Sequence, residues 1–179
     1  MVATKLMTAE ELANLPDDGY RYELLRGALI QMAPPDRVHG ARQARLAQQF
    51  MNYADRYGGE VAGEADFQLE VNPDTVLAPD VTYTRPDMVP TDAGRGYARY
   101  APDVAAEIDS PSNRPGERRG KLHAYHKAGT RLVLFVNDDK RTVTVVHAEG
   151  QSEVLQVGDV FDGGDVMPGF SLPVADFFR

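Results

Sequence analysis

The chain has 179 residues, a formal net charge of −8 and no cysteine. The absence of cysteine excludes a disulfide scaffold, a thiolate zinc site and a cysteine nucleophile. No stretch approaches the roughly 20 apolar residues of a membrane helix, and the N-terminus lacks the apolar run of a signal peptide, so we expect a soluble, cytoplasmic protein without a membrane partner.

The N-terminal segment predicts a short helix followed by a β-hairpin. Thr8 and Glu11 have the spacing of a capping box, in which each side chain satisfies a backbone amide of the first helical turn. Residues 20–25 and 28–32 then have the composition of two strands, and the dipeptide Arg26-Gly27 between them is typical of a tight hairpin turn.

The middle of the chain predicts one long helix and two strands. Residues 38–57 carry an apolar stripe at helical spacing. Residues 61–71 alternate between apolar and polar side chains, which indicates a strand with one buried face, and residues 75–84 form a further strand. Residues 85–100 are rich in proline, glycine and charge and indicate a long, functional or mobile loop. The stripe of the helix consists of Ala47, Phe50, Met51 and Ala54.

The C-terminal half alternates strands with one helix. A short strand at 103–109 precedes a helix at 115–128, and the strongly apolar segment 131–137 indicates a central strand. Further strands follow at 141–147 and near 153–157, before a tail rich in glycine and proline. Because no linker or internal repeat interrupts this order, we expect residues 1–179 to form one α/β domain, with a mixed β-sheet core flanked by helices.

Two carboxylates lie within otherwise apolar strands, where an unpartnered charge is costly. Asp80 and Glu107 occupy such positions, and on neighbouring strands they would form the oxygen-rich site that Mg²⁺ prefers. Lys121 lies on the helix after the Glu107 strand and could assist an attacking water, and Tyr125, four residues later, shares its helix face. Taken singly, a strand-end aspartate or a helix-borne lysine is more often a solvated surface residue.

Several short motifs, in one order along nearly the whole chain, resemble the Uma family of restriction endonucleases within the PD-(D/E)XK nuclease superfamily. An ordered set is more specific than any one motif alone. The segments are Tyr22-Glu23-Leu24-Leu25-Arg26-Gly27, Pro34-Pro35 with His39-Gly40, Ala78-Pro79-Asp80-Val81, Ala106-Glu107-Ile108-Asp109-Ser110-Pro111-Ser112, Lys121-Leu122 with Tyr125 and Ala128-Gly129, and Asp165-Val166-Met167-Pro168-Gly169-Phe170.

The resemblance implies a restriction-endonuclease-like fold and a metal-dependent phosphodiesterase site. Asp80 corresponds to the PD aspartate and Glu107 to the second acid, and the carbonyl of Ile108 is an expected further metal ligand. Lys121 corresponds to a lysine that this family takes from the following helix. Glu23 corresponds to an acid near the N-terminal hairpin that reaches the site, so the expected catalytic set is Asp80, Glu107, Lys121 and Glu23.

The chain departs from the family pattern at three positions. Asp109 occupies the position at which the superfamily usually has its lysine and at which this family commonly has an aliphatic residue. It either adds a metal ligand or raises the local negative charge. Ala28 replaces a second hairpin acid, and Asn137 replaces an aspartate after the central strand. None of these departures removes a core catalytic residue.

Four further residues are candidate substrate contacts, and each has a purely structural alternative. His39 contacts a phosphate or makes local hydrogen bonds at a helix start, and Gln68 lines the cleft or lies on a solvated strand face. Tyr125 covers the site or belongs to the core. Arg118, in a small basic cluster, contacts phosphate or is a solvated residue of the first helical turn.

The expected function is therefore that of a Mg²⁺-dependent endonuclease acting on DNA, with Mn²⁺ as a substitute metal. Cutting two strands is readily done by two copies of one site, so a homodimer is expected. The alternative is a catalytically degenerate protein of the same fold that binds nucleic acid or protein. The net charge of −8 favours this alternative, because non-specific nucleic-acid affinity comes largely from positive charge.

Overall fold

A computed structural model of the chain describes residues 6–91, 96–109 and 115–179. The Ser110-Pro111-Ser112 part of the family-like motif and four residues of the long 85–100 loop lie outside this described part. Among the described residues, no helix combines the length and the apolar character needed to cross a membrane.

The largest sheet has six strands in the order β10-β9-β8-β7-β6-β3. Only the β7–β8 pair is parallel, and the helix α3 (Pro115–Ala128) connects these two strands as a crossover. Its strands are β3 (Glu60–Ala62), β6 (Val81–Thr84), β7 (Val104–Ile108), β8 (Leu132–Asn137), β9 (Thr142–His147) and β10 (Ser152–Gln156).

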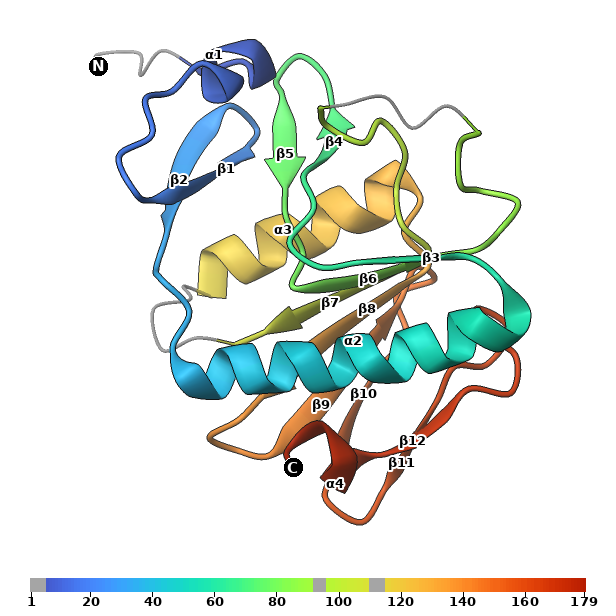
Figure 1. The fold of residues 1–179 in the computed structure, drawn as a ribbon. Coiled ribbons are helices and arrows are strands. Elements are labelled where there is room, and N and C mark those ends of the chain that lie inside the picture. The colour runs from blue at the N-terminus through green and yellow to red at the C-terminus, as the bar shows by residue number, and fades with distance from the viewer. Residues whose placement is uncertain (1–5, 92–95, 110–114) are drawn as a thin grey trace.

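A second sheet of four antiparallel strands, in the order β2-β1-β5-β4, packs above the first (Figure 1). Its β1–β2 turn has positive φ values at Arg26 and Gly27, the conformation that a two-residue hairpin of this kind needs. The helix α1 (Ala9–Ala13) lies beside it, and Thr8 and Glu11 form the expected capping box. Its strands are β1 (Arg21–Leu25), β2 (Ala28–Met32), β4 (Phe67–Glu70) and β5 (Thr75–Leu77).

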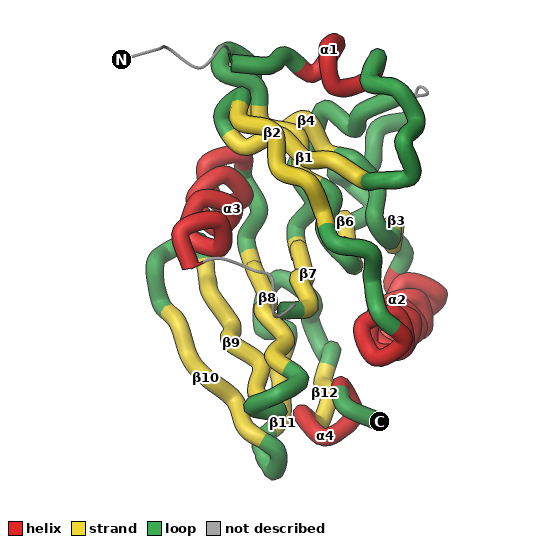
Figure 2. Tube along the Cα trace, turned by 90° about the vertical axis from the view of Figure 1, so that its left-hand side faces the viewer, coloured by secondary structure: helices red, strands yellow, loops and turns green. Residues whose placement is uncertain are grey.

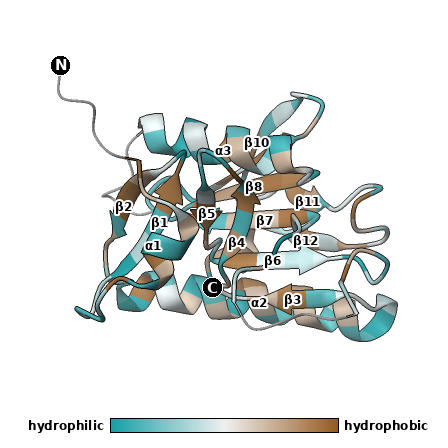
Figure 3. Ribbon diagram, turned by 90° about the horizontal axis from the view of Figure 1, so that it is seen from above, coloured by the Kyte–Doolittle hydropathy of each residue, from teal (hydrophilic) through white to brown (hydrophobic). Residues whose placement is uncertain are grey.

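The two long helices cover opposite faces of the six-stranded sheet (Figure 2). The helix α2 (Arg37–Tyr57) packs Leu46, Phe50 and Tyr53 onto one face, and α3 packs Ala124 and Tyr125 onto the other. Figure 3 shows that apolar residues concentrate in the central strands β7 and β8, between these layers. The C-terminal elements β11 (Val160–Asp162), β12 (Ser171–Pro173) and α4 (Val174–Phe177) complete the α2 side of the core.

The architecture confirms the predicted fold class, but two predicted strands are wrong in extent. The segment 61–71 is divided between β3 and β4, which belong to different sheets, and Glu64 between them has φ +52°. Val71, expected to be buried, is 74% exposed. The segment 75–84 is likewise divided between β5 and β6. In both places the chain passes from one sheet to the other, and alternation of side chains cannot report such a change of partner.

Two smaller expectations also differ from the structure. The buried stripe of α2 is centred on Leu46, Phe50 and Tyr53, while Met51 is 55% exposed. Phe50 is buried as expected, and Ala47 and Ala54 pack against the same core, so Met51 is the one member of the expected stripe that lies outside it. The glycine-rich tail, for which no element was predicted, contains β11, β12 and α4.

Candidate active site

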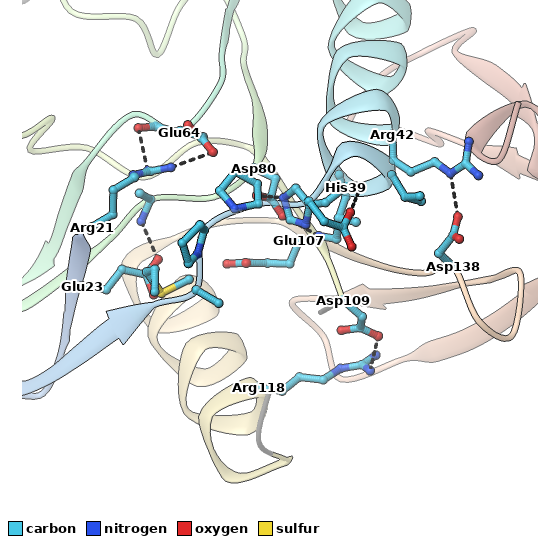
Figure 4. Close-up of a pocket in the computed structure, with 18 of the residues that line it drawn as sticks. Arg21, Glu23, His39, Arg42, Glu64, Asp80, Glu107, Asp109, Arg118 and Asp138 are labelled. Atoms are coloured by element: carbon cyan, nitrogen blue, oxygen red, sulfur yellow. Dashed lines mark hydrogen bonds and ion pairs between the residues drawn. The ribbon is translucent and has the colours of Figure 1, made fainter. Parts of the chain in front are cut away.

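A cleft of about 740 Å³ opens between the β1–β2 hairpin, the start of α2 and the end of β7 (Figure 4). Its lining is rich in carboxylates and includes residues from both large sheets. The members used below are Glu23, His39, Asp80, Glu107, Ile108 and Arg118.

Asp80 lies in the three-residue connector that joins β5 of one sheet to β6 of the other. Its Oδ2 accepts a hydrogen bond of 2.6 Å from the Ile108 backbone amide, and its Oδ1 lies 2.9 Å from Nε2 of His39. The Gln43 side-chain amide donates to its backbone carbonyl at 3.0 Å. Because both carboxylate oxygens have a protein partner, the orientation of Asp80 is fixed before any ligand arrives.

Glu107 points from β7 toward α3, which supplies two partners from one helix face. Tyr125 donates its hydroxyl to Oε1 of Glu107 at 2.5 Å, and Nζ of Lys121 lies 3.3 Å from each carboxylate oxygen. Glu23 reaches the same group from the other sheet, with its Oε2 2.8 Å from Nζ of Lys121. Its Oε1 accepts a hydrogen bond from the Ala78 amide, in the connector that carries Asp80.

The electrostatics of this group reflect burial and an excess of negative charge. The pKa of Glu107 is raised to about 7, chiefly by burial; the charge of Lys121 opposes this shift, Glu23 and Asp80 add to it, and the Tyr125 hydrogen bond opposes it. Burial alone would lower the pKa of Lys121, but Glu107 and Glu23 reverse this effect and raise the pKa above its ordinary value. One buried ammonium therefore faces two carboxylates, Glu23 and Glu107.

The protonation states of two neighbouring side chains, Tyr125 and His39, follow from the same contacts. Burial, followed by the proximity of Glu107, raises the pKa of Tyr125 well above its ordinary value, so the phenol remains a hydrogen-bond donor. The hydrogen bond to Asp80 raises the pKa of His39, and burial opposes this shift. Both side chains thus act on the carboxylates as donors rather than as acceptors.

The donor chemistry of the cleft fits a hard divalent cation. The carboxylates of Asp80 and Glu107 offer the one or two acidic ligands that Mg²⁺ takes from proteins. The Ile108 amide points to Asp80, and the amide and carbonyl of one strand residue point to the same side, so the Ile108 carbonyl faces this region as well. Among the described residues, no group of three or more histidine or acidic side chains is arranged to hold a metal.

Arg118 is held in place by two interactions rather than solvated at the start of a helix. Its Nη1 donates to Oδ2 of Asp109 at 3.1 Å, and its guanidinium lies 4.0 Å from the centroid of the Phe135 ring. Asn137 donates to the same Asp109 oxygen at 3.1 Å. Asp109 therefore has two protein donors, and two of the three residues that depart from the family pattern, Asp109 and Asn137, contact each other.

The structure brings together most of the candidate residues. Lys121 and Tyr125 lie directly behind Glu107, and the others line the cleft, with the exception of Gln68. Gln68 is on β4, whose backbone pairs with β5 and with Ala98, and it does not line the cleft. The expectation that its strand continues along the site is wrong because that strand changes sheets between β3 and β4.

Sequence reasoning missed three polar residues of this region. Arg21 and Arg42 line the cleft, and Gln43 bonds the Asp80 carbonyl. The signals were present: residues two apart on a strand share a face, as Arg21 and Glu23 do, and residues three or four apart on a helix share a face, as His39 shares one with Arg42 and Gln43.

A mixed sheet with carboxylates in and beside neighbouring strands, and a lysine from the following helix, is the arrangement expected of the restriction-endonuclease-like class. The chain belongs to the Uma2 family, whose model is described as "Putative restriction endonuclease" and matches residues 9–175. It is also similar to the crystal structure of a "putative nuclease belonging to DUF820" from Anabaena variabilis. The TM-score is 0.83 and the identity 22%, over 96% of this chain and 97% of that one, a likeness that shows the fold alone. No curated protein matches the chain.

Proposed function

We propose that this protein is a divalent-metal-dependent endonuclease that hydrolyses phosphodiester bonds in DNA. The observation that carries the proposal is that Asp80 and Glu107 line one cleft, with Lys121 directly behind Glu107, in a chain of a nuclease family. Asp80, Glu107 and the Ile108 carbonyl would hold the metal, for which Mg²⁺ is the proposed ion and Mn²⁺ a substitute. When bound, such a metal polarises a phosphoryl oxygen and lowers the pKa of a coordinated water.

The chain's own residues orient these groups and balance their charge. His39 and the Ile108 amide fix the two oxygens of Asp80, while Tyr125 fixes Glu107. Lys121 keeps a positive charge behind Glu107, where it favours the negative charge that develops on the phosphoryl oxygens during attack. Glu23 holds the ammonium on its other side, so Lys121 is positioned from two sheets.

The test is plasmid cleavage with Mg²⁺ or Mn²⁺, comparing the wild type with Asp80→Asn and Lys121→Met. Gln68→Ala is the matched control, because this candidate residue lies outside the cleft. We expect nicking or linearisation by the wild type and the control, and at least a hundredfold loss in both cleft variants while they remain folded by circular dichroism, in line with the roughly 10²- to 10³-fold loss on removal of one preorganised electrostatic group.

If the wild type is inert on duplex, single-stranded and branched DNA alike, the endonuclease proposal is refuted. The protein would then be a binding module that keeps the fold. Metal affinity distinguishes the two cases, because in the binding module Asp80→Asn should barely change a weak Mg²⁺ affinity.

We further propose that residues 1–179 act as one unit and that two copies cooperate to cut both strands, since each copy carries a single candidate site. Sedimentation of the purified protein with and without duplex DNA tests this. A monomer in both conditions that still linearises plasmid in one binding event would exclude a dimer.

A further inference from the structure

Every arginine that lines the cleft, among the described residues, is paired with a carboxylate that also lines it. In Figure 4 the three pairs lie on different sides of Asp80 and Glu107. The N–O distances are 2.6, 2.6 and 3.1 Å, in the pairs Arg21–Glu64, Arg42–Asp138 and Arg118–Asp109.

Two of the pairs join elements that are distant along the chain, so local sequence does not account for them, whereas Arg118 and Asp109 are nine residues apart. Arg21 of β1 meets Glu64, which lies between β3 and β4. Arg42 of α2 meets Asp138, in the turn after β8, although 96 residues separate them. Three different elements, β1, α2 and α3, thus direct a guanidinium toward the same opening.

These pairs are accessible enough to exchange partners. The exposed fractions of the two side chains are 45% and 32% for Arg21 and Glu64, and 16% and 35% for Arg42 and Asp138. They are 34% and 12% for Arg118 and Asp109, so Asp109 is the least accessible of the three carboxylates. Exposed pairs of this kind contribute little to folding. A guanidinium binds phosphate with the same planar fork of donors that it uses for a carboxylate.

We propose that Arg21, Arg42 and Arg118 are the phosphate contacts for the DNA backbone, and that their three carboxylate partners hold them in place until phosphates displace the carboxylates. The identity of the polyanion rests on the proposed function. In the free protein no guanidinium of the cleft is unpaired within the described residues, so weak non-specific DNA binding follows from the pairing as well as from the net charge of −8.

The test is binding without cleavage. The affinity of each variant for a fluorescein-labelled DNA duplex is measured by anisotropy in EDTA, over a range of salt concentrations. Asp138→Asn frees Arg42, while Asp139→Asn is the matched control: Asp139 is the next residue and lines the same cleft, but forms no ion pair among the described residues. Both substitutions remove one negative charge at nearly the same place.

We expect Asp138→Asn to bind DNA about two- to fivefold tighter, because an exposed ion pair no longer competes with phosphate, and Asp139→Asn to change affinity by less than about twofold. Arg42→Ala should weaken binding and lower the slope of log K against log salt by about 0.9, the value of one phosphate contact on duplex DNA. In the Arg42→Ala background, Asp138→Asn should act no more strongly than Asp139→Asn.

Equal effects of the two acidic substitutions in the wild-type background would overturn the proposal, as would an unchanged salt slope in Arg42→Ala. Arg42 also donates to the Arg179 carbonyl, so if Arg42→Ala fails to fold, Arg21→Ala with Glu64→Gln repeats the cycle at a more exposed pair. Cleavage assays test the proposed function separately. If the wild type cleaves DNA but the two acidic substitutions change the affinity equally, only the proposed phosphate contacts are refuted. If the wild type binds no DNA at low salt, the phosphate contacts are refuted whatever its activity.

Discussion

Replacing Lys121 by methionine should leave two buried carboxylates without their cation. Glu23 is 1% exposed and Glu107 is 6% exposed, and Nζ of Lys121 lies 2.8 Å from an oxygen of the first and 3.3 Å from both oxygens of the second. Methionine has a similar length and keeps the packing of the aliphatic stem. Removing one partner of a buried ion pair typically costs about 3–5 kcal/mol, because the remaining charge is uncompensated.

The ability of a carboxylate to take up a proton limits this cost and gives it a pH dependence. Without Lys121 the pKa of Glu107 rises above about 7, and the group becomes neutral in the folded state. Because the pKa of Glu107 is already about 7 in the wild type, neutralising this group costs about 1.4 kcal/mol at pH 8 and nothing at pH 5. The variant should therefore be less destabilised, relative to the wild type, in acid than at pH 8.

Urea denaturation at both pH values measures the effect. With a slope of about 2 kcal/mol per molar urea, a loss of about 4 kcal/mol lowers the midpoint by about 2 M. Adding Glu23→Gln to the variant should restore roughly half of the loss, since glutamine keeps an acceptor for the Ala78 amide and removes one unpaired charge. A loss that is below about 1 kcal/mol, or equal at the two pH values, would refute the reasoning that Lys121 is the buried counter-ion.

Three further outcomes are expected. Tyr125→Phe removes the hydroxyl that donates to Glu107, and it should lower the free energy of unfolding measured in urea by about 1.5–3 kcal/mol. Because the pKa of Glu107 increases, the rise of any cleavage activity should also move to higher pH. An unshifted profile would contradict a positioning role. Mg²⁺ at about ten times its dissociation constant should stabilise the wild type by about 1.4 kcal/mol, which corresponds to a rise in Tm of about 3–6 °C. Differential scanning calorimetry should show no change in the Tm of Asp80→Asn on adding the metal. Burial lowers the pKa of His126 from 6.5, so the unfolded chain takes up the proton first and the wild type loses stability as the pH falls below about 6.5. His126→Gln should lose less stability between about pH 7.5 and about pH 5 in the same denaturation assay, and an equal loss would show that other groups dominate.

Local sequence signals were sufficient to predict those structural features that depend on residues close together in the chain. The capping box of Thr8 and Glu11, the Arg26-Gly27 turn and the limits of the 115–128 helix are of this kind. Alternation over 61–71 was not sufficient, because the pattern continues across a change of sheet. Side-chain periodicity gives the face of a strand and contains no information about which neighbour the strand pairs with.

The same distinction applies to the candidate site. Asp80 and Glu107 stand out because a carboxylate in an apolar strand is costly, and Tyr125 shares a helix face with Lys121. That Glu23 meets Lys121 depends on how the two sheets pack, and only the family resemblance indicated it. The carboxylate partners of Arg21 and Arg42 are likewise far away along the chain, and no local pattern predicts such pairs.

The connector of residues 78–80 also has a consequence for how this sequence can change in length. The backbone amide of its first residue, Ala78, donates to Glu23, and the carboxylate of its last residue, Asp80, accepts a hydrogen bond from the Ile108 amide. These three consecutive residues therefore set the offset between the two sheets. One inserted residue would reverse the side-chain alternation of everything that follows, turning Val81 outward from its core and separating Asp80 from its partners. Homologous chains should therefore vary in length at the β9–β10 turn and in the C-terminal tail, while the spacing between β5 and β6 stays constant even where its residues differ.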